Sequence, residues 1–178
     1  MKVLPTEIPE VKIIEPRVFS DSRGYFFESY QTDRYREAGI TKPFVQDNVS
    51  LSSYGTLRGL HYQDPNPQGK LVSVLEGRVL DVAVDLRRES PTFGKWVGVE
   101  LSSDNFRQLW VPEGFAHGFV ALSDTVLFQY KCTALYDPKS EKCIRWNDPT
   151  LNIDWGVKYP LISPKDQQGL FWKDLFGE

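Results

Sequence analysis

Short runs in which apolar and polar residues alternate recur along most of the chain. Residues 71–75 and 78–86 form one such pair, and the Glu-Gly dipeptide between them is typical of a hairpin turn. The second run places Asp81 and Asp85 on one face and Leu80, Val82, Val84 and Leu86 on the other. Further runs predict strands at 25–30, 96–101, 108–111, 119–122, 126–133 and 143–146. Short strands at nearly regular spacing indicate an all-β sandwich or barrel.

Signals for helices are few. Residues 32–38 predict a short helix, with Thr32 as the N-cap and Gly39 after its end. A helical tail is predicted over residues 167–176. Between these elements the polar run 46–48 is typical of a loop, one that offers hydrogen-bonding groups at the rim of a pocket.

The N-terminal residues 1–16 contain Pro5, Pro9 and Pro16. Proline has no N–H to donate to a sheet, so this segment predicts an extended N-terminal arm or an edge strand. The two alternatives are an arm that packs on a second subunit and a strand on the chain's own sheet. No internal repeat or linker interrupts the pattern, so a single domain is predicted for residues 1–178.

Composition excludes several classes of protein. The net charge is 21 − 24 = −3, which argues against non-specific nucleic-acid binding. No stretch approaches the ~20 apolar residues of a membrane span, and the N-terminus lacks the apolar run of a signal peptide. A cytoplasmic location is therefore predicted. Cys132 and Cys143 form no CxxC pair, which predicts buried free thiols rather than a disulfide framework or a zinc site.

The first candidate for chemistry is the stretch 55–63, which holds His61, one of two histidines in the chain. In a regular strand Arg58 and His61 would point to opposite sides, but Gly59 suggests a bulge that re-aims one of them. A neutral imidazole beside a guanidinium suits proton transfer on an anionic substrate. The alternative is an edge strand with a surface arginine and a structural histidine.

A second motif, Pro112-x-Gly114-x-x-His117, resembles the second motif of the cupin superfamily. Many cupins bind a metal through this histidine together with two histidines and a glutamate of a first motif. Here the first motif reads Leu60-His61-Tyr62-Gln63 instead of His-x-His, and two histidines cannot make a three-histidine site. No metal and no cofactor are therefore predicted.

Several segments in order resemble one metal-free branch of that superfamily, the dTDP-4-dehydrorhamnose 3,5-epimerase family. The resemblance runs from Arg17 to Asp166 and rests on these segments: Asp-Ser-Arg-Gly-Tyr-Phe-Phe-Glu, Gln-Asp-Asn, Gly-Thr-Leu-Arg-Gly-Leu-His-Tyr-Gln, Gln-Gly-Lys-Leu-Val, Val-Pro-Glu-Gly-Phe-Ala-His-Gly-Phe, Tyr-Lys-Cys-Thr, Trp-Asn-Asp-Pro and Ser-Pro-Lys-Asp. It implies a cupin-type jelly-roll barrel with a few short helices, mainly near the C-terminus. It also implies a homodimer in which an N-terminal segment crosses to the partner.

The activity that the resemblance implies is inversion of C3 and C5 of dTDP-4-dehydro-6-deoxy-D-glucose. The product is dTDP-4-dehydro-L-rhamnose, a precursor of L-rhamnose in surface polysaccharide such as the O-antigen of lipopolysaccharide. Both carbons flank a ketone, so the reaction needs a base, a group that stabilises the enolate and an acid. Histidine titrates near pH ~6.5, which suits His61 to the role of base. The resemblance pairs it with Asp166, places Lys70 at the ketone and makes Tyr130 the proton donor.

The resemblance also implies the substrate contacts. Arg23 and Arg58 are expected at the phosphates, where a guanidinium offers forked donors, and Tyr136 is expected against the thymine ring. The remaining contacts are Glu28, Gln46, Asp47, Asn48, Lys70, His117, Glu141 and Lys165. His117 is the contact that the cupin turn itself uses, which favours a structural role. A basic residue of the family is replaced by Pro138, and Arg23 and Glu28 are candidates for serving the partner's pocket.

Three other functions compete with this one. The closest is an epimerase that inverts C3 or C5 alone, for another deoxysugar. A metal-dependent oxygenase is disfavoured by the number of histidines. A non-catalytic module that binds a sugar nucleotide is disfavoured because the base and acid positions, His61 and Tyr130, are both occupied.

Overall fold

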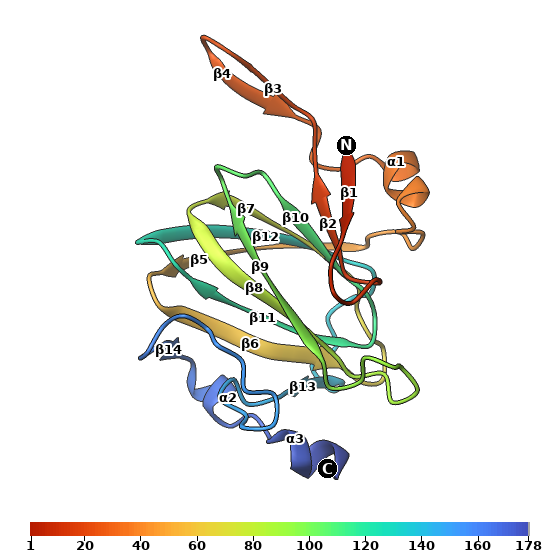
Figure 1. Cartoon of the computed structure of the whole chain (residues 1–178), viewed down its shortest axis with the longest axis vertical. Helices are drawn as coiled ribbons and strands as arrows, with labels where there is room; N and C mark the ends of the chain where they lie inside the picture. Colours follow the sequence, from red (N-terminus) through yellow and green to blue (C-terminus); the bar gives the residue numbers. More distant parts are fainter. Residues whose placement is uncertain (178) are drawn as a thin grey trace.

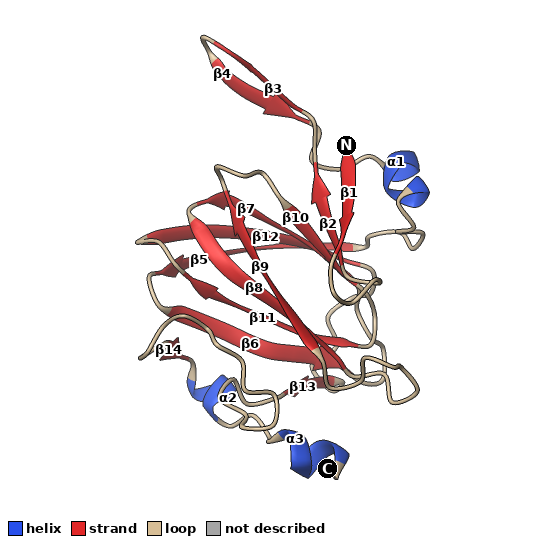
Figure 2. Ribbon diagram, in the orientation of Figure 1, coloured by secondary structure: helices blue, strands red, loops and turns tan. Residues whose placement is uncertain are grey.

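Two β-sheets make up most of the molecule (Figure 2). The computed structural model describes residues 1–177, so Glu178, the last residue of the predicted domain, lies outside the described residues. The first sheet has the order β1 (Lys2–Pro5), β2 (Lys12–Glu15), β10 (Gln108–Val111), β7 (Lys70–Glu76), β12 (Thr125–Cys132) and β5 (Gln46–Ser53). The second has the order β13 (Glu141–Cys143), β6 (Thr56–Gln63), β11 (Phe115–Ala121), β8 (Arg78–Asp85) and β9 (Trp96–Ser102), and β14 (Leu161–Ile162) pairs with β6.

The two sheets face each other across a buried apolar core. Phe119 of β11 and Phe128 of β12 stack with their ring centroids 4.1 Å apart, which joins the sheets directly. Val72 and Leu109 from the first sheet and Ala83 from the second complete the same cluster, each fully buried. The observed architecture is a jelly-roll barrel, so the predicted all-β fold is confirmed.

The outer face of the second sheet is covered by the C-terminal part of the chain. Trp155 and Trp172 pack there against Val82 and Val84 of β8. Burial on both faces explains why β11 has no exposed residue. Asp81 and Asp85 alternate with apolar residues along β8, but both carboxyl side chains are fully buried. Both faces of β8 therefore lie inside the molecule.

Helices occupy the two ends of the molecule (Figure 2). The helix predicted at 32–38 is observed as α1 (Thr32–Glu37), although Gln31 rather than Thr32 is its N-cap. The helical tail predicted over 167–176 is confirmed only for α3 (Trp172–Phe176); a separate short helix, α2 (Pro164–Gln167), ends where the predicted one begins, and residues 168–171 between them are not helical. Within residues 1–177, none of the helices has the length and apolar character that crossing a membrane requires.

Two N-terminal segments behave differently from each other. β1 and β2 pair as a hairpin at one edge of the first sheet, where β2 bonds to β10. A second hairpin, β3 (Val18–Asp21) and β4 (Gly24–Phe27), projects away from the barrel (Figure 1). The polar run 46–48, predicted as a loop, instead begins the regular strand β5, so that prediction was wrong. Pairing with β12 along its whole length overrides the low strand propensity of Asp and Asn.

Candidate active site

A bulge in β6 decides where the first motif points. His117 of β11 lies opposite His61, and Phe119 lies opposite Arg58, so one extra residue is inserted in β6 between them. His117 and Phe119 share a face, and therefore Arg58 and His61 share it as well, although their spacing in a regular strand would separate them. Gly59 permits the bulge: its φ is +127°, and an added Cβ would lie 2.6 Å from the Cα of Gly118.

Replacing Gly59 with alanine is expected to lower the free energy of unfolding by roughly 3–4 kcal/mol, the sum of backbone strain and a clash with buried backbone. Gly24→Ala is the matched control, because Gly24 has a φ of +131° but nothing within 4 Å of its added Cβ. That variant is expected to lose only about 1–2 kcal/mol, from strain alone. Urea unfolding of both variants measures the difference; equal losses would mean that close packing at Gly59 is unimportant.

His61 and Asp166 form a hydrogen-bonded pair at the edge of β6. The Nε2 atom of His61 lies 2.7 Å from Oδ1 of Asp166, whose side chain is 5% exposed. Asp166 reaches β6 from α2, in the gap between β13 and β14, and its Oδ2 accepts the N–H of Gly59 at 3.2 Å. The N-cap Ser163 fixes the start of α2 by accepting the N–H of Asp166.

The protonation of this pair follows from its surroundings. Burial acts to raise the pKa of Asp166, but hydrogen bonds with His61 and Gly59 outweigh it and hold the pKa below the usual range. Asp166 is therefore a carboxylate, which can only accept a hydrogen bond. The proton in the bond consequently belongs to Nε2 of His61, and Nδ1 carries the free lone pair of a base.

The opposite sheet presents a row of side chains to the same interior. Tyr130 follows Phe128 by two residues on β12, so both face the core, and the ring of Phe128 also lies against His117. Cys132, two residues further, lies opposite Lys70 of β7 and Gln46 of β5. Tyr130 itself lies opposite Asn48. His61 and Tyr130 thus face the barrel interior from opposing sheets.

Burial shapes the charge of this row. Desolvation lowers the pKa of Lys70 from its usual value, while the nearby Asp81 opposes that change. Desolvation also raises the pKa of Tyr130, so its phenol keeps its proton at neutral pH; the positive charge of Arg58 partly offsets the effect. The guanidinium of Arg58 donates to Oγ of Ser52 at 3.2 Å and to the carbonyl of Leu51, which turns it toward β5.

A second group of predicted site residues, Tyr136, Glu141 and Lys165, lies together at the rim of the barrel interior. The hydroxyl of Tyr136 donates to Glu141 at 2.5 Å, and Lys165 pairs with the same carboxylate. Burial acts to raise the pKa of Glu141, but the bonds from Lys165 and Tyr136 lower it. The N–H of Tyr136 donates to the side chain of Gln46, which connects this cluster to the row on the first sheet.

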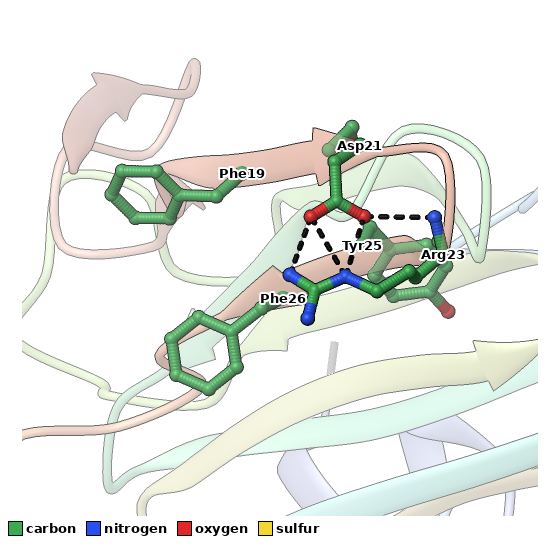
Figure 3. A pocket seen from close by; sticks show the side chains of 7 residues that line it. Phe19, Asp21, Arg23, Tyr25 and Phe26 are labelled. Carbon is green, nitrogen blue, oxygen red and sulfur yellow. Dashed lines mark hydrogen bonds and ion pairs between the residues drawn. The ribbon is translucent and has the colours of Figure 1, made fainter.

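Three predicted contacts lie elsewhere in the chain. Asp47 lies on the other face of β5, where it pairs with Lys131 at 3.0 Å, because neighbours in a strand alternate faces. Arg23 and Glu28 belong to the projecting hairpin and the segment after it. Figure 3 shows Arg23 turned toward Asp21 beside a hollow lined by Phe19, Tyr25 and Phe26. Glu28 pairs instead with Arg34 of α1.

The sequence did not predict that His117 pairs with the buried Asp81. Nε2 of His117 lies 2.8 Å from Oδ1 of Asp81, which is fully buried, and desolvation raises the pKa of that carboxyl. Asp81 interrupts the run Val79 to Val84, and a carboxylate within an apolar strand is the signal that marks it. The pair lies under the interior surface near Lys70, whose charge acts on Asp81.

A jelly-roll barrel that sets a histidine–carboxylate pair opposite a lysine and a tyrosine defines a class, the cupin-fold epimerases. The chain belongs to the dTDP-4-dehydrorhamnose 3,5-epimerase family, whose model matches residues 5–174.

Individual relatives are similar over nearly the whole chain. The dTDP-4-dehydrorhamnose 3,5-epimerase of Pseudomonas aeruginosa is 56% identical over 176 residues, which cover 98% of this chain and 97% of that protein. The crystal structure of dTDP-6-deoxy-D-glucose-3,5-epimerase from Legionella pneumophila, in complex with dTDP-4-keto-L-rhamnose, is 56% identical with a TM-score of 0.93, covering 96% and 92% of the two chains. A dTDP-4-dehydrorhamnose 3-epimerase of Streptomyces niveus is 42% identical, covering 96% of this chain and 83% of that protein.

Proposed function

We propose that this protein inverts C3 and C5 of dTDP-4-dehydro-6-deoxy-D-glucose and releases dTDP-4-dehydro-L-rhamnose. The observation that carries the proposal is the pair of His61 and Asp166 facing the interior into which Tyr130 projects from the opposite sheet. Inversion at a carbon requires a base on one face of the sugar and an acid on the other. Two opposing sheets supply that geometry for a ring lying between them.

In this mechanism Nδ1 of His61 removes the proton next to the ketone. Asp166 holds the ring by accepting the N–H of Nε2, and it stabilises the imidazolium that forms. The electron pair of the broken C–H bond moves onto the ketone oxygen, giving an enolate. The ammonium of Lys70 stabilises that negative charge, and it does so strongly because the site is desolvated.

Tyr130 then donates its proton to the carbon from the other face. Burial keeps the phenol protonated until the carbanion is present. The tyrosinate that results is restored by solvent or by the imidazolium before the next inversion. The same three groups serve both carbons, since each is next to the same ketone.

The nucleotide end of the substrate is assigned to the rim. Arg58 contacts the phosphates, Gln46 and Asn48 line the adjacent wall, and Tyr136 stacks on the thymine ring beside Glu141 and Lys165. Arg23 and Glu28 reach the pocket of a partner subunit in a homodimer, which their position on and after the projecting hairpin supports. A single domain, a cytoplasmic location and a place in the synthesis of rhamnose-containing polysaccharide complete the proposal.

A second candidate function is inversion at one carbon only. It is favoured by the similarity to the Streptomyces niveus protein, which carries the name of a 3-epimerase. Both candidates use His61 as base, so the residues of the site do not separate them. They differ in the number of carbons that exchange a proton with water.

Incubation of the substrate in heavy water tests the proposal. The double epimerase is expected to incorporate deuterium at both C3 and C5, each with inverted configuration, as read by NMR. Label at a single carbon would support the second candidate. Absence of label at both carbons, with nucleotide still bound, would contradict an enzymatic function and support a binding module.

A further inference from the structure

Three side chains with metal-binding atoms converge at the edge of β6. A ring nitrogen of His61, Sγ of Cys143 and a carboxylate oxygen of Asp166 all lie within 4.8 Å of one another. The convergence follows from strand register, because Cys143 of β13 lies directly opposite His61 of β6. Opposed residues in an antiparallel pair carry their side chains on the same face. The proposed reaction uses two of these groups and leaves the thiol without a function.

We propose that His61, Cys143 and Asp166 form an inhibitory site for a thiophilic divalent cation such as Zn²⁺ or Cd²⁺. A nitrogen, a sulfur and an oxygen are a ligand set that such ions prefer, whereas Mg²⁺ prefers oxygen alone. Three protein ligands leave a fourth position open toward the interior for water. The sequence predicted neither a three-histidine cupin site nor a zinc site built on the two cysteines. The present set of ligands comes together only through the register of β13 on β6 and the position of α2.

The distances require small movements. Tetrahedral zinc, with bonds of about 2.0–2.3 Å, places its ligand atoms roughly 3.3–3.8 Å apart. His61 and Asp166 are separated by 2.7 Å across their hydrogen bond, so they must open by about half an ångström as the ion replaces the shared proton. The thiol, which lies within 4.8 Å of the other two ligand atoms, must approach them by at most about 1.5 Å. Its hydrogen bond to the carbonyl of Ile144, at 3.5 Å, holds it only weakly, because a thiol is a weak donor.

The surrounding charge favours a dication. Cys143 is half-buried, and the carboxylates of Asp166 and Glu141 lie close enough to act on its thiol. Lys165 opposes this charge, but it pairs with Glu141, which leaves the carboxylate of Asp166 as the unpaired charge next to the thiol. The negative charge beside the site attracts a divalent ion, and coordination releases the thiol proton to water.

A metal ion bound at this site would block proton transfer by occupying the imidazole of His61. The ion takes Nε2 of His61, so the ring proton moves to Nδ1 and the imidazole stays neutral. Nδ1 then has no lone pair with which to accept a proton from the sugar. The inhibition itself rests on the proposed function, but the binding of the ion does not.

Titration with Cd²⁺ tests the site without any substrate. The wild-type protein is expected to develop the ultraviolet cadmium–thiolate absorption at one equivalent. Cys143→Ser is expected to lose that absorption and to bind Cd²⁺ at least tenfold more weakly. Cys132→Ser is the matched control: it removes the other thiol, which is fully buried on the opposite sheet, and it is expected to keep the absorption.

A second measurement follows epimerisation during the same titration. Inhibition of the wild type is expected to track the absorption, to be reversed by EDTA, and to be absent with Mg²⁺. Cys143→Ser is expected to remain active and to resist Cd²⁺ by the same factor of ten or more. The inference fails if the absorption is missing in the wild type, if it persists in Cys143→Ser, or if both proteins are inhibited equally. If the wild-type protein showed no epimerase activity before any metal was added, the proposed function would be contradicted. The cadmium–thiolate absorption would still test the metal site, because it needs no substrate.

Discussion

Replacing His61 with alanine is expected to slow epimerisation by roughly 10³- to 10⁴-fold, the upper part of the range for loss of a general base. The removal is this costly because the ring of His61 supplies the free lone pair, while its partner Asp166 is buried and already bonded to Gly59. The rate loss is expected in kcat rather than in KM, since the imidazole acts on the reacting carbon. Deuterium uptake from heavy water into the substrate is expected to fall by the same factor.

The matched control for this variant is Tyr62→Phe. Tyr62 is the next residue of β6 and packs with the apolar cluster on the outer face of that sheet. Its hydroxyl takes no part in the proposed reaction, so the rate of epimerisation by Tyr62→Phe is expected to stay within about twofold of that of the wild type. If His61→Ala exchanged deuterium as fast as the wild type, another group would have to be the base.

Replacing Lys70 with methionine is expected to slow epimerisation by roughly 10²- to 10³-fold, which is the usual loss when one donor to a developing oxyanion is removed. Methionine keeps the length and apolar stem of lysine but carries no charge. Lys142→Met is the matched control, because Lys142 lies on β13 with its ammonium paired to Asp64 at the surface. A loss of equal size in the two variants would show that general charge, and not the position of Lys70, is responsible.

The pH dependence of the wild type tests the same assignment. Desolvation lowers the pKa of Lys70 below the usual 10.5, so the ammonium loses its proton at a lower pH than an exposed lysine does. The charge on Lys70 is therefore present below that pKa and lost as the pH rises through it, and the rate is expected to fall with it. Lys70→Arg, which stays charged above pH ~12, is expected to move this alkaline limit upward even if the overall rate is lower.

Local sequence patterns were sufficient to predict the strands in which apolar and polar residues alternate clearly. The two strands predicted at 71–75 and 78–86 are observed as β7 and β8, because alternation of apolar residues acts over a few residues. The hairpin predicted between them was wrong: β7 pairs with β10 and β12 in the first sheet, and β8 pairs with β11 and β9 in the second, so the Glu-Gly turn joins the two sheets. Strand β5 shows the opposite case. Its first residues, Gln46 to Asn48, have the composition of a loop, and pairing with β12 makes them a strand. That pairing joins residues more than eighty positions apart in sequence, which no local pattern contains.

For the candidate site too, the sequence predicted which residues are present but not how their side chains are arranged. Motif by motif, the chain contains the histidine, aspartate, lysine and tyrosine that the resemblance required, and it suggested a bulge at Gly59. The direction of each side chain depended on register: the bulge turns Arg58 and His61 to one face, and alternation sends Asp47 to the other. The sequence named Asp81 and Cys143 without a partner for either, and burial and strand pairing brought them to His117 and His61.

The sequence by itself determined the family, the all-β architecture and the chemical groups available, because each of these depends on composition and short motifs. Tertiary structure decided which groups meet. His61 and Asp166 stand more than a hundred residues apart and touch because α2 closes a gap along one strand, and Tyr130 faces them because two sheets pack through one core. Proximity between distant segments arises from burying both faces of the sheets, a property of the folded chain as a whole.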